Sequence, residues 1–310
     1  MATTSQTGDT ISGTNRSRGS NRSSRDSGNG RNRKGAGRQL HGGRVTHAVL
    51  ILFTTGSLFP LVWTAVAASR DNTRLARTPP PFWFGENLFK NLEIAWTDAN
   101  MGAALFHTTI VAGAIAAGTV VFSTLAGFAF AKLRFRFKNL LLLLVIGTMM
   151  VPPQLSVVPL YMLIAELSWT DQLQSVILPT LVSAFGVFFM RQYLTGALPT
   201  ELIEAARVDG ASSLRVVWHV VFPAARPAMA VLGMLTFVMA WNDFFWPMIA
   251  LTQNGSPTVQ VALTGLGRGY IPDQSVIMAG ALLGTLPLLV AFVIFGRHVV
   301  GGIMQGAVKG

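Results

Sequence analysis

The sequence predicts an all-α membrane protein that crosses the bilayer six times and carries a helical elbow between its fourth and fifth spans. Two features of composition indicate lipid as the solvent: 51% of the 310 residues are hydrophobic and only 12% are charged, whereas about a quarter of a soluble domain is charged. The third observation is the arrangement of the charges, which cluster in short gaps between apolar runs. Each run is close to the ~20 residues needed to cross the hydrocarbon core. The sequence has no cysteine, which excludes disulfides, thiol catalysis and Cys-ligated metals.

Residues 1–44 are predicted to form a disordered, basic, cytoplasmic tail. They consist mainly of Ser, Thr, Asn, Gly and Arg, and such a segment buries too little apolar surface to offset its chain entropy. The tail is either solvated, with a role in orientation alone, or held by its arginines near anionic headgroups. Residues 45–310 are predicted to form one transmembrane domain.

Six apolar runs are predicted to be spans. Within the first, Ala65-Val66-Ala67 is similar to the cleavage site of an export signal. The preceding polar region is very long and the apolar run is long enough to cross the bilayer, so we expect an uncleaved helix. In chain order, the predicted spans cover about Thr46–Ala68, Ala103–Ala131, Leu140–Ala165, Gln174–Met190, Ala228–Leu251 and Ser275–Phe295.

The distribution of basic residues predicts the orientation, because cytoplasmic loops are enriched in Lys and Arg. With both termini in the cytoplasm, 19 of the 24 basic residues lie inside, and the opposite orientation inverts this bias. The basic residues then act as topology determinants, so the high isoelectric point does not indicate a nucleic acid partner. The five basic residues left outside are Arg70, Arg74, Arg77, Lys90 and Arg268.

The connection between the fourth and fifth spans is too long for a simple turn, and its residues 199–223 are predicted to form a helix–turn–helix elbow at the membrane surface. Thr200 is placed to cap a first helix, and Glu201 and Glu204 are placed near the positive end of its dipole. Asp209-Gly210 is predicted to end that helix, because glycine accepts the left-handed conformation common after a helix C-terminus.

The second helix of the elbow is predicted to start at a cap formed by Ser212 or Ser213. Leu214, Val217 and Val221 would share one face of it. Pro223 and Pro227 are predicted to end this helix before the fifth span. Taken alone, such an elbow is an ordinary interhelical connection.

The spacing of residues in this elbow resembles the EAA signature of the permeases of binding-protein-dependent ABC importers. Glu204-Ala205-Ala206 is followed after three residues by Gly210, and nine residues later by Val220-Val221-Phe222-Pro223. Val220 and Phe222 stand where the family usually has Ile and Leu. The resemblance implies that the elbow docks on a cytoplasmic ATPase and transmits its closure to the spans, through the coupling residues Glu204, Ala205, Ala206, Asp209, Gly210 and Pro223.

Further segments are similar to the maltose-type, carbohydrate-uptake branch of these permeases. Thr108-Thr109 departs from the Asn-Ser often found there, and the N-terminal tail lies outside the likeness. The resemblance implies three kinds of partner: an ATPase dimer, a second, homologous permease subunit and an extracytoplasmic solute-binding protein. The segments that carry it are Thr124–Phe135, Met149–Gln154, Trp241–Phe244 and Gly306–Gly310.

The sequence contains no G-x-x-x-x-G-K-[ST] motif, so we expect ATP to be bound by the partner ATPase and no cofactor to be bound by this chain. The resemblance to the carbohydrate-uptake branch implies that the solute is a mono-, di- or oligosaccharide, or a related polyol or glycerophosphodiester. A neutral solute is favoured because no Lys or Arg lies deep in a predicted span. The partners could hold the selective contacts.

Asp243 is the only acidic residue well inside a predicted span, and such residues usually face a cavity or a partner. One hypothesis places Asn242, Asp243 and Gln154 along the translocation path; the alternative is that Asp243 pairs with the partner subunit. Pro152-Pro153, next to Gln154, is predicted to interrupt the third span. Gly280 and Gly284 are predicted to serve helix packing.

Two other classes of function are disfavoured by the sequence. A secondary transporter usually shows more spans or inverted repeats and several intramembrane charges, and it gives the elbow signature no role. A membrane enzyme needs convergent catalytic groups at one depth. The five histidines are scattered along the sequence without metal-ligand spacing. We therefore expect a multi-pass, non-catalytic permease subunit in the cell membrane.

Overall fold

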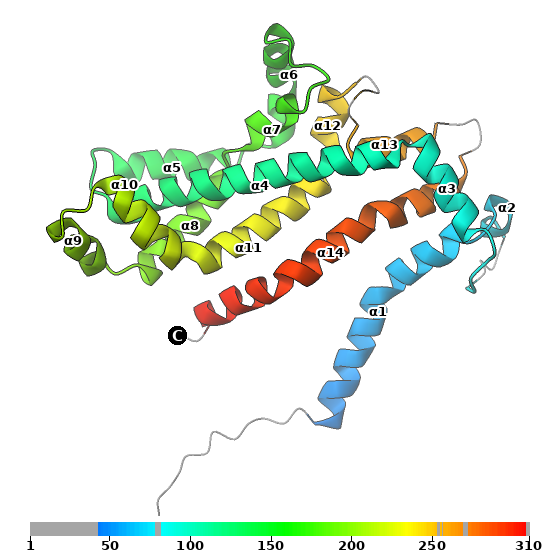
Figure 1. The fold of residues 1–310 in the computed structure, drawn as a ribbon, viewed down its shortest axis with the longest axis horizontal. Helices are drawn as coiled ribbons and strands as arrows, with labels where there is room; N and C mark the ends of the chain where they lie inside the picture. The colour runs from blue at the N-terminus through cyan, green and yellow to red at the C-terminus, as the bar shows by residue number, and fades with distance from the viewer. Residues whose placement is uncertain (1–42, 78–81, 253–254, 256, 269–271, 308–310) are drawn as a thin grey trace, which may run out of the picture. The chain divides into compact units, whose positions relative to one another are not determined.

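The computed structural model describes residues 43–77, 82–252, 255, 257–268 and 272–307, and every regular element among them is a helix (Figure 1). The first half contains α1 (Arg44–Ala68), α2 (Asn72–Leu75), α3 (Leu88–Asp98), α4 (Met101–Lys132), α5 (Lys138–Thr148), the 3₁₀ turn η1 (Pro153–Ser156) and α6 (Val157–Glu166). The second half contains α7 (Gln174–Thr180), α8 (Ala184–Ala197), α9 (Thr200–Val208), α10 (Ser213–Val216), the π-helical turn η2 (Val217–Val221), α11 (Phe222–Trp241), α12 (Phe245–Ala250), α13 (Val259–Leu266) and α14 (Gln274–Ala307).

The predicted all-α membrane class is confirmed. Four described helices are long and apolar enough to cross a bilayer, and the number rises to six if each of two bent helix pairs forms one span. The exact count of six therefore stays a prediction. The chain divides into two units, residues 1–51 and 52–310. Apart from Gly43 and Arg44, the predicted tail over residues 1–44 lies outside the described residues.

The third predicted span is broken at the prolines, as expected. α5 and the η1–α6 segment meet at an angle of 92°, and Pro152 lies in the extended connection between them. A proline ring removes one backbone donor and keeps the preceding residue out of helical geometry. The fourth predicted span is also bent, by 41° between α7 and α8.

The predicted limits of the fifth span are wrong at both ends. Residues Ser213–Trp241 form one candidate span, so Pro223 and Pro227 do not end the second elbow helix. Pro223 lies in the first turn of α11, directly after the π turn η2, and local π geometry is one way in which membrane helices accommodate proline. The apolar run then breaks after Trp241, before the short helix α12.

The long helix α4 is the centre of the packing, and it contacts both α8 and α11 (Figure 1). Small residues allow the backbones to approach closely, as is typical of membrane helices. A Cβ atom placed on Gly127 would lie 2.7 Å from both the Met190 Cβ and the Arg191 backbone nitrogen on α8. Gly280 and Gly284 of α14 have the predicted packing role, since a Cβ on Gly284 would lie 2.7 Å from Val259 of α13.

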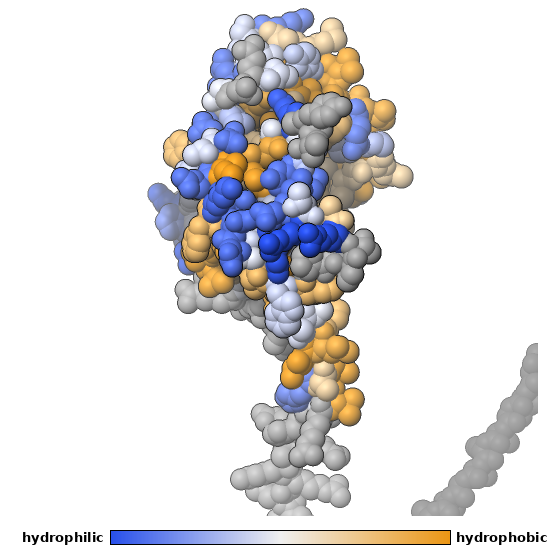
Figure 2. All heavy atoms as spheres, turned by 90° about the vertical axis from the view of Figure 1, so that its right-hand side faces the viewer, coloured by the Kyte–Doolittle hydropathy of each residue, from blue (hydrophilic) through white to orange (hydrophobic). Residues whose placement is uncertain are grey.

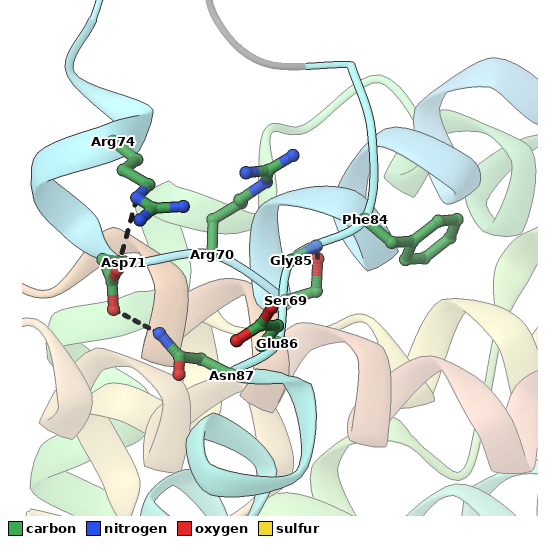
Figure 3. Close-up of a pocket in the computed structure, with 8 residues that line it drawn as sticks. All are labelled: Ser69, Arg70, Asp71, Arg74, Phe84, Gly85, Glu86 and Asn87. Carbon is green, nitrogen blue, oxygen red and sulfur yellow. Dashed lines mark hydrogen bonds and ion pairs between the residues drawn. The ribbon is translucent and has the colours of Figure 1, made fainter.

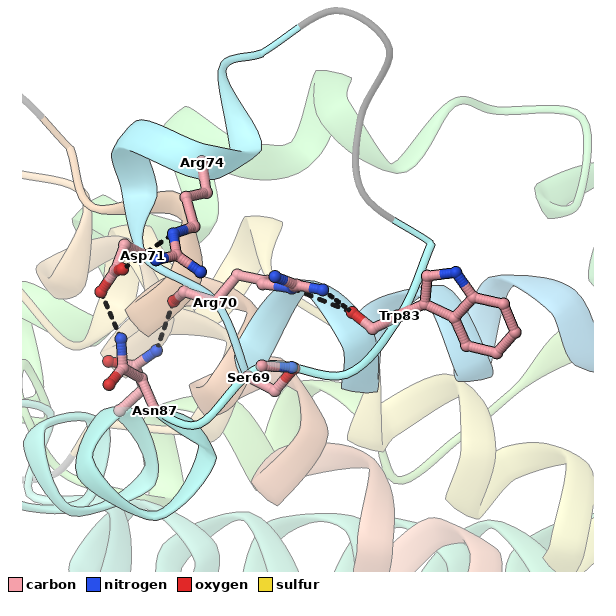
Figure 4. A network of polar contacts seen from close by, with 8 residues as sticks. Ser69, Arg70, Asp71, Arg74, Trp83 and Asn87 are labelled. Carbon is pink, nitrogen blue, oxygen red and sulfur yellow. Dashed lines mark hydrogen bonds and ion pairs between the residues drawn. The ribbon is translucent and has the colours of Figure 1, made fainter.

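Hydrophilic side chains gather on the face that carries α2 and α3 (Figure 2). Beneath it, a small cavity of about 200 Å³ lies between the end of α1 and the start of α3. Asp71 forms an ion pair with Arg74, with 3.7 Å between Oδ2 and Nε, and accepts a hydrogen bond from Asn87 (Figure 3). The Arg70 guanidinium donates twice to the Trp83 carbonyl, at 2.9 and 2.5 Å (Figure 4). This network joins Trp83 and Asn87, which precede α3, to Arg70 and Asp71, which follow α1.

Candidate coupling elbow and path residues

The elbow consists of α9, α10 and η2, and it follows α8 directly in the chain (Figure 1). Pro199 precedes the first turn of α9 without a side-chain cap, so the predicted capping role of Thr200 is wrong: Thr200 is itself the first helical residue. Glu201 lies in the first turn, as predicted, where a carboxylate is favourable beside the helix dipole. Ser212 is the cap of α10, since its hydroxyl accepts from the Arg215 N–H at 3.4 Å.

The turn between the two elbow helices is a Schellman motif centred on Gly210. The Gly210 N–H donates to the Arg207 carbonyl at 3.0 Å, and the Ala211 N–H donates to the Ala206 carbonyl at 2.9 Å. Gly210 has φ of +76°, which costs a residue with a Cβ roughly 1–2 kcal/mol. The predicted left-handed turn at Asp209-Gly210 is therefore present in the structure.

A buried cluster anchors the elbow to the helices behind it. Ile203 of α9 and Val216, Val217 and Val221 of the second elbow helix are all buried. They belong to one apolar cluster with residues from α4, α8 and α11, which include Phe128, Met190, Leu194, Ala225 and Leu232. Because these contacts tie the elbow to three different helices, a force applied to the elbow acts on the spans directly.

The elbow also exposes large apolar side chains. Val208 is 88% exposed, Leu214 is 68% exposed and Trp218 is 57% exposed. The prediction that Leu214 shares a face with Val217 and Val221 is wrong, because the latter two are buried. Trp218 follows Leu214 by four residues and is exposed like it, whereas Val217 and Val221, also four residues apart, are both buried.

Most of the other predicted coupling residues are exposed as well. Glu204, Ala205, Asp209 and Pro223 are exposed, and Ala206 is half-buried. Within the described part of the chain, neither Glu204 nor Asp209 takes part in an ion pair. Their carboxylates are therefore available to a partner.

The residues predicted to line a path fall at two breaks in the helices. Asn242 is exposed, and its side-chain amide donates to the Val238 carbonyl at 2.8 Å. Asp243 is half-buried, and its Oδ1 accepts from the Phe245 N–H at 3.2 Å, so the carboxylate holds the turn into α12. Gln154 lies in η1 and is exposed. Among the described residues, no hydrogen bond joins Gln154 to Asn242 or Asp243.

Sequence reasoning missed Trp218 and the turn formed by Asp243. Trp218 lies between Val217 and His219, and the available signal was its spacing of four residues from Leu214, which puts the two side chains on one face of a helix. The Asp243 turn could have been predicted, because an Asp side chain readily accepts a hydrogen bond from the backbone N–H two residues further along the chain.

Comparison with known proteins agrees with this architecture. The family described as "Binding-protein-dependent transport system inner membrane component" matches residues 119–304. The lactose transport system permease protein LacG of Rhizobium radiobacter is 30% identical over 265 residues, which cover 86% of this chain and 96% of that protein. The arabinooligosaccharides transport system permease protein AraQ of Halalkalibacterium halodurans is 30% identical and covers 82% of this chain and 92% of its own length.

A third relative is the sn-glycerol-3-phosphate transport system permease protein UgpE of Escherichia coli, which is 32% identical over 269 residues, 84% of this chain and 95% of that protein. A crystal structure of a bacterial ABC transporter involved in the import of the acidic polysaccharide alginate has the same fold. Its TM-score is 0.70 at 19% identity, with 82% of this chain and 94% of that chain covered. The chain belongs to the family of inner membrane components of binding-protein-dependent transport systems, and it is a membrane-embedded permease of the ABC importer class.

Proposed function

We propose that this chain is one of two homologous permease subunits of an importer for a sugar or sugar-like solute, and that its elbow docks on a separate ATPase dimer. One observation carries the proposal: the elbow exposes Val208, Leu214 and Trp218, while Ile203 and Val217 fix it in the core. Exposed apolar residues beside free carboxylates are the composition of a protein interface, not of a solvated loop.

The elbow is connected to the proposed path by a single helical rod. Residues Ser213–Trp241 run without interruption over 29 residues, a length of about 43 Å at 1.5 Å per residue. The rod begins beside Gly210 and ends at Asn242 and Asp243. ATP-driven closure of the ATPase would therefore tilt this rod and change the exposure of the path residues, which is alternating access by population shift.

The solute class is inferred from the relatives and from this chain together. Lactose, arabinooligosaccharides and sn-glycerol-3-phosphate appear in the names of the relatives, and all three carry several hydroxyl groups. The exposed amides of Asn242 and Gln154 and the carboxylate of Asp243 are suited to hydroxyl recognition. We propose delivery by an extracytoplasmic solute-binding protein, with both termini and the elbow in the cytoplasm.

Copurification tests the docking of the elbow. The tagged chain, gently solubilised from its native membrane, should recover an ATPase with a P-loop and a second permease, identified by mass spectrometry. The double variant Val208→Lys/Leu214→Asp should lose the ATPase by tenfold or more and keep the second permease. Both substitutions are compatible with the helix dipoles, because the introduced Lys would lie at the C-terminus of α9 and the introduced Asp at the N-terminus of α10.

The control places a charge on an exposed apolar residue away from the elbow. Phe89 of α3 is 83% exposed, and Phe89→Asp should leave recovery of the ATPase unchanged. Full recovery of the ATPase by the elbow variant would contradict the docking proposal. Recovery of the wild-type chain alone from several mild detergents would contradict the proposed assembly with an ATPase dimer and a second permease.

A further inference from the structure

A group of cations without acidic partners surrounds the connection between α4 and α5, residues 132–138, which we call the basic loop. The sequence has no Asp or Glu between Asp98 and Glu166. In the described part of the chain, the one ion pair between basic and acidic side chains lies elsewhere, between Arg74 and Asp71. The uncompensated cations are Lys132, Arg134, Arg136 and Lys138 of the basic loop and Arg191 of α8.

Three of these cations lie close together in space although they come from three helices. Burial of the Lys138 ammonium at the start of α5, and after it the positive charges of Arg191 on α8 and Lys132 at the end of α4, disfavour its charged form. The Lys132 ammonium donates to the Thr195 carbonyl at 3.2 Å, near the C-terminal end of α8. Packing like charges together in one chain is unfavourable, so the arrangement calls for an anion.

The basic loop also borders an open cavity of about 380 Å³. Its polar lining comes from Arg134, Lys138 and Asn139, and its apolar lining includes Phe135, Phe137 and Leu140. A cavity lined both by cations and by exposed aromatic and aliphatic side chains matches an amphiphile with an anionic head.

Unused hydrogen-bond donors are present around this cavity. The Lys138 ammonium, which has three N–H groups, donates to the Leu133 carbonyl at 3.0 Å. No side chain caps the N-terminus of α5, and its first turn has no acidic residue, so its backbone N–H groups also favour an anion. On α8, the Nε atom of Arg191 is buried without an acceptor.

The apolar half of the site continues along α5. Phe137 is 62% exposed and Leu140 is 52% exposed. One turn further, Leu143 and Leu144 are also exposed, at 63% and 59%. Since the basic loop joins two segments that have the composition of membrane spans, these side chains lie where a lipid acyl chain would leave its headgroup.

We propose that the basic loop binds the phosphate of an anionic phospholipid through Arg134 and Lys138, with its acyl chains lying along α5. Binding would neutralise the repulsion among Lys132, Lys138 and Arg191 and would fix the position of α5 against α8. The lining of the cavity includes neither the exposed apolar residues of the elbow nor the proposed path residues. Basic pockets between membrane helices that hold lipid headgroups are physically well precedented.

Native mass spectrometry of the purified full-length chain tests the proposal, with phosphatidylglycerol and phosphatidylcholine of identical acyl chains as the probes. The wild type should retain phosphatidylglycerol in preference to phosphatidylcholine. Arg134→Gln/Lys138→Gln should weaken phosphatidylglycerol retention about thirtyfold, because each basic residue near an anionic surface contributes a factor of roughly five. Arg134→Lys/Lys138→Arg should keep most of it.

Arg136 provides a matched control in the same loop, since its guanidinium lies over the Phe137 ring at 4.9 Å and does not line the cavity. Arg136→Gln should retain phosphatidylglycerol; an equal loss in this variant would overturn a specific site. A wild type without preference for phosphatidylglycerol would overturn the proposal whether or not any variant folds. Displacement of the lipid by millimolar inorganic phosphate would assign the site to a free anion instead. Unchanged lipid retention in Arg134→Gln/Lys138→Gln, with loss of the copurifying ATPase, would reassign the surface to protein docking.

Discussion

At the scale of single residues, the backbone of Gly210 explains why the elbow depends on glycine. Its φ of +76° is the only reason, because a Cβ built on Gly210 has no heavy atom within 4 Å. A side chain here would therefore change the turn through backbone strain and not through a clash. The Schellman bonds to Arg207 and Ala206 place α10 at a fixed angle to α9, so strain at Gly210 would reorient the whole docking surface.

Substitution of Gly210 should uncouple ATP hydrolysis from uptake. Gly210→Val should reduce solute uptake at least tenfold while the assembled complex still hydrolyses ATP. The reason is that the left-handed backbone at this position becomes about 1–2 kcal/mol less favourable. Gly210→Asn should recover much of the uptake, since asparagine tolerates left-handed backbone. Gly196→Ala serves as the control: Gly196 is helical with nothing within 4 Å of its added Cβ. Normal coupling in Gly210→Val would count against the proposed role of the elbow.

Asp243 offers a second test, because its charge and its hydrogen bond can be separated. Asp243→Asn keeps an oxygen that accepts from the Phe245 N–H and removes only the charge, whereas Asp243→Ala removes both. If Asp243 lines the path, Asp243→Asn should lower uptake while the complex still copurifies intact. If the residue pairs with the partner subunit, the same variant should lose the second permease from the purified complex. Asp243→Ala should be less stable than Asp243→Asn in thermal unfolding, by about 1 kcal/mol.

At the scale of elements, the structure shows which features of a membrane protein can be predicted from its sequence. The left-handed turn at Gly210 and the break at Pro152 were predictable, because glycine and proline restrict the backbone locally. The break after Trp241 and the π turn at Val217–Val221 were not predicted from helical periodicity: in a nearly uniform apolar run, every register satisfies the pattern. For the same reason, Leu214 was wrongly placed on one face with Val217 and Val221. Which helices pack together could not be predicted from the sequence, because this depends on where small residues such as Gly127 let two helices approach closely.

The α4–α8 contact should be sensitive to one methyl group. Gly127→Ala would bring its Cβ within 2.7 Å of the Met190 Cβ and the Arg191 backbone, and backbone cannot move aside as a flexible side chain can. We expect a loss of about 1–3 kcal/mol in stability, measured as a lower unfolding temperature in detergent. On the same helix, Gly113 has no atom within 4 Å of its added Cβ, so Gly113→Ala should be neutral or mildly stabilising. Equal stability of the two variants would show that α4 and α8 do not pack this closely.

At the scale of the whole molecule, orientation determines what each surface can meet. The elbow serves an ATPase only if it faces the cytoplasm, and the polar region around α2 and α3 meets a solute-binding protein only if it faces outward. The rule that places basic residues inside predicts both together. The two surfaces lie at the ends of different helical segments, so one labelling experiment on intact cells addresses both.

The sequence suits this experiment because it contains no cysteine, and each single substitution is therefore a unique thiol. Ser213 at the start of α10 and Thr73 in α2 are both exposed and small, so neither Ser213→Cys nor Thr73→Cys should disturb packing. In intact cells, with any outer barrier permeabilised, a membrane-impermeant maleimide should label Thr73→Cys and leave Ser213→Cys unlabelled. After disruption of the membrane, both should react. Labelling of Ser213→Cys from outside would invert the topology and remove the elbow from the reach of a cytoplasmic ATPase. Because the phospholipid site on the basic loop is defined without reference to either side, that result would leave its test unaffected.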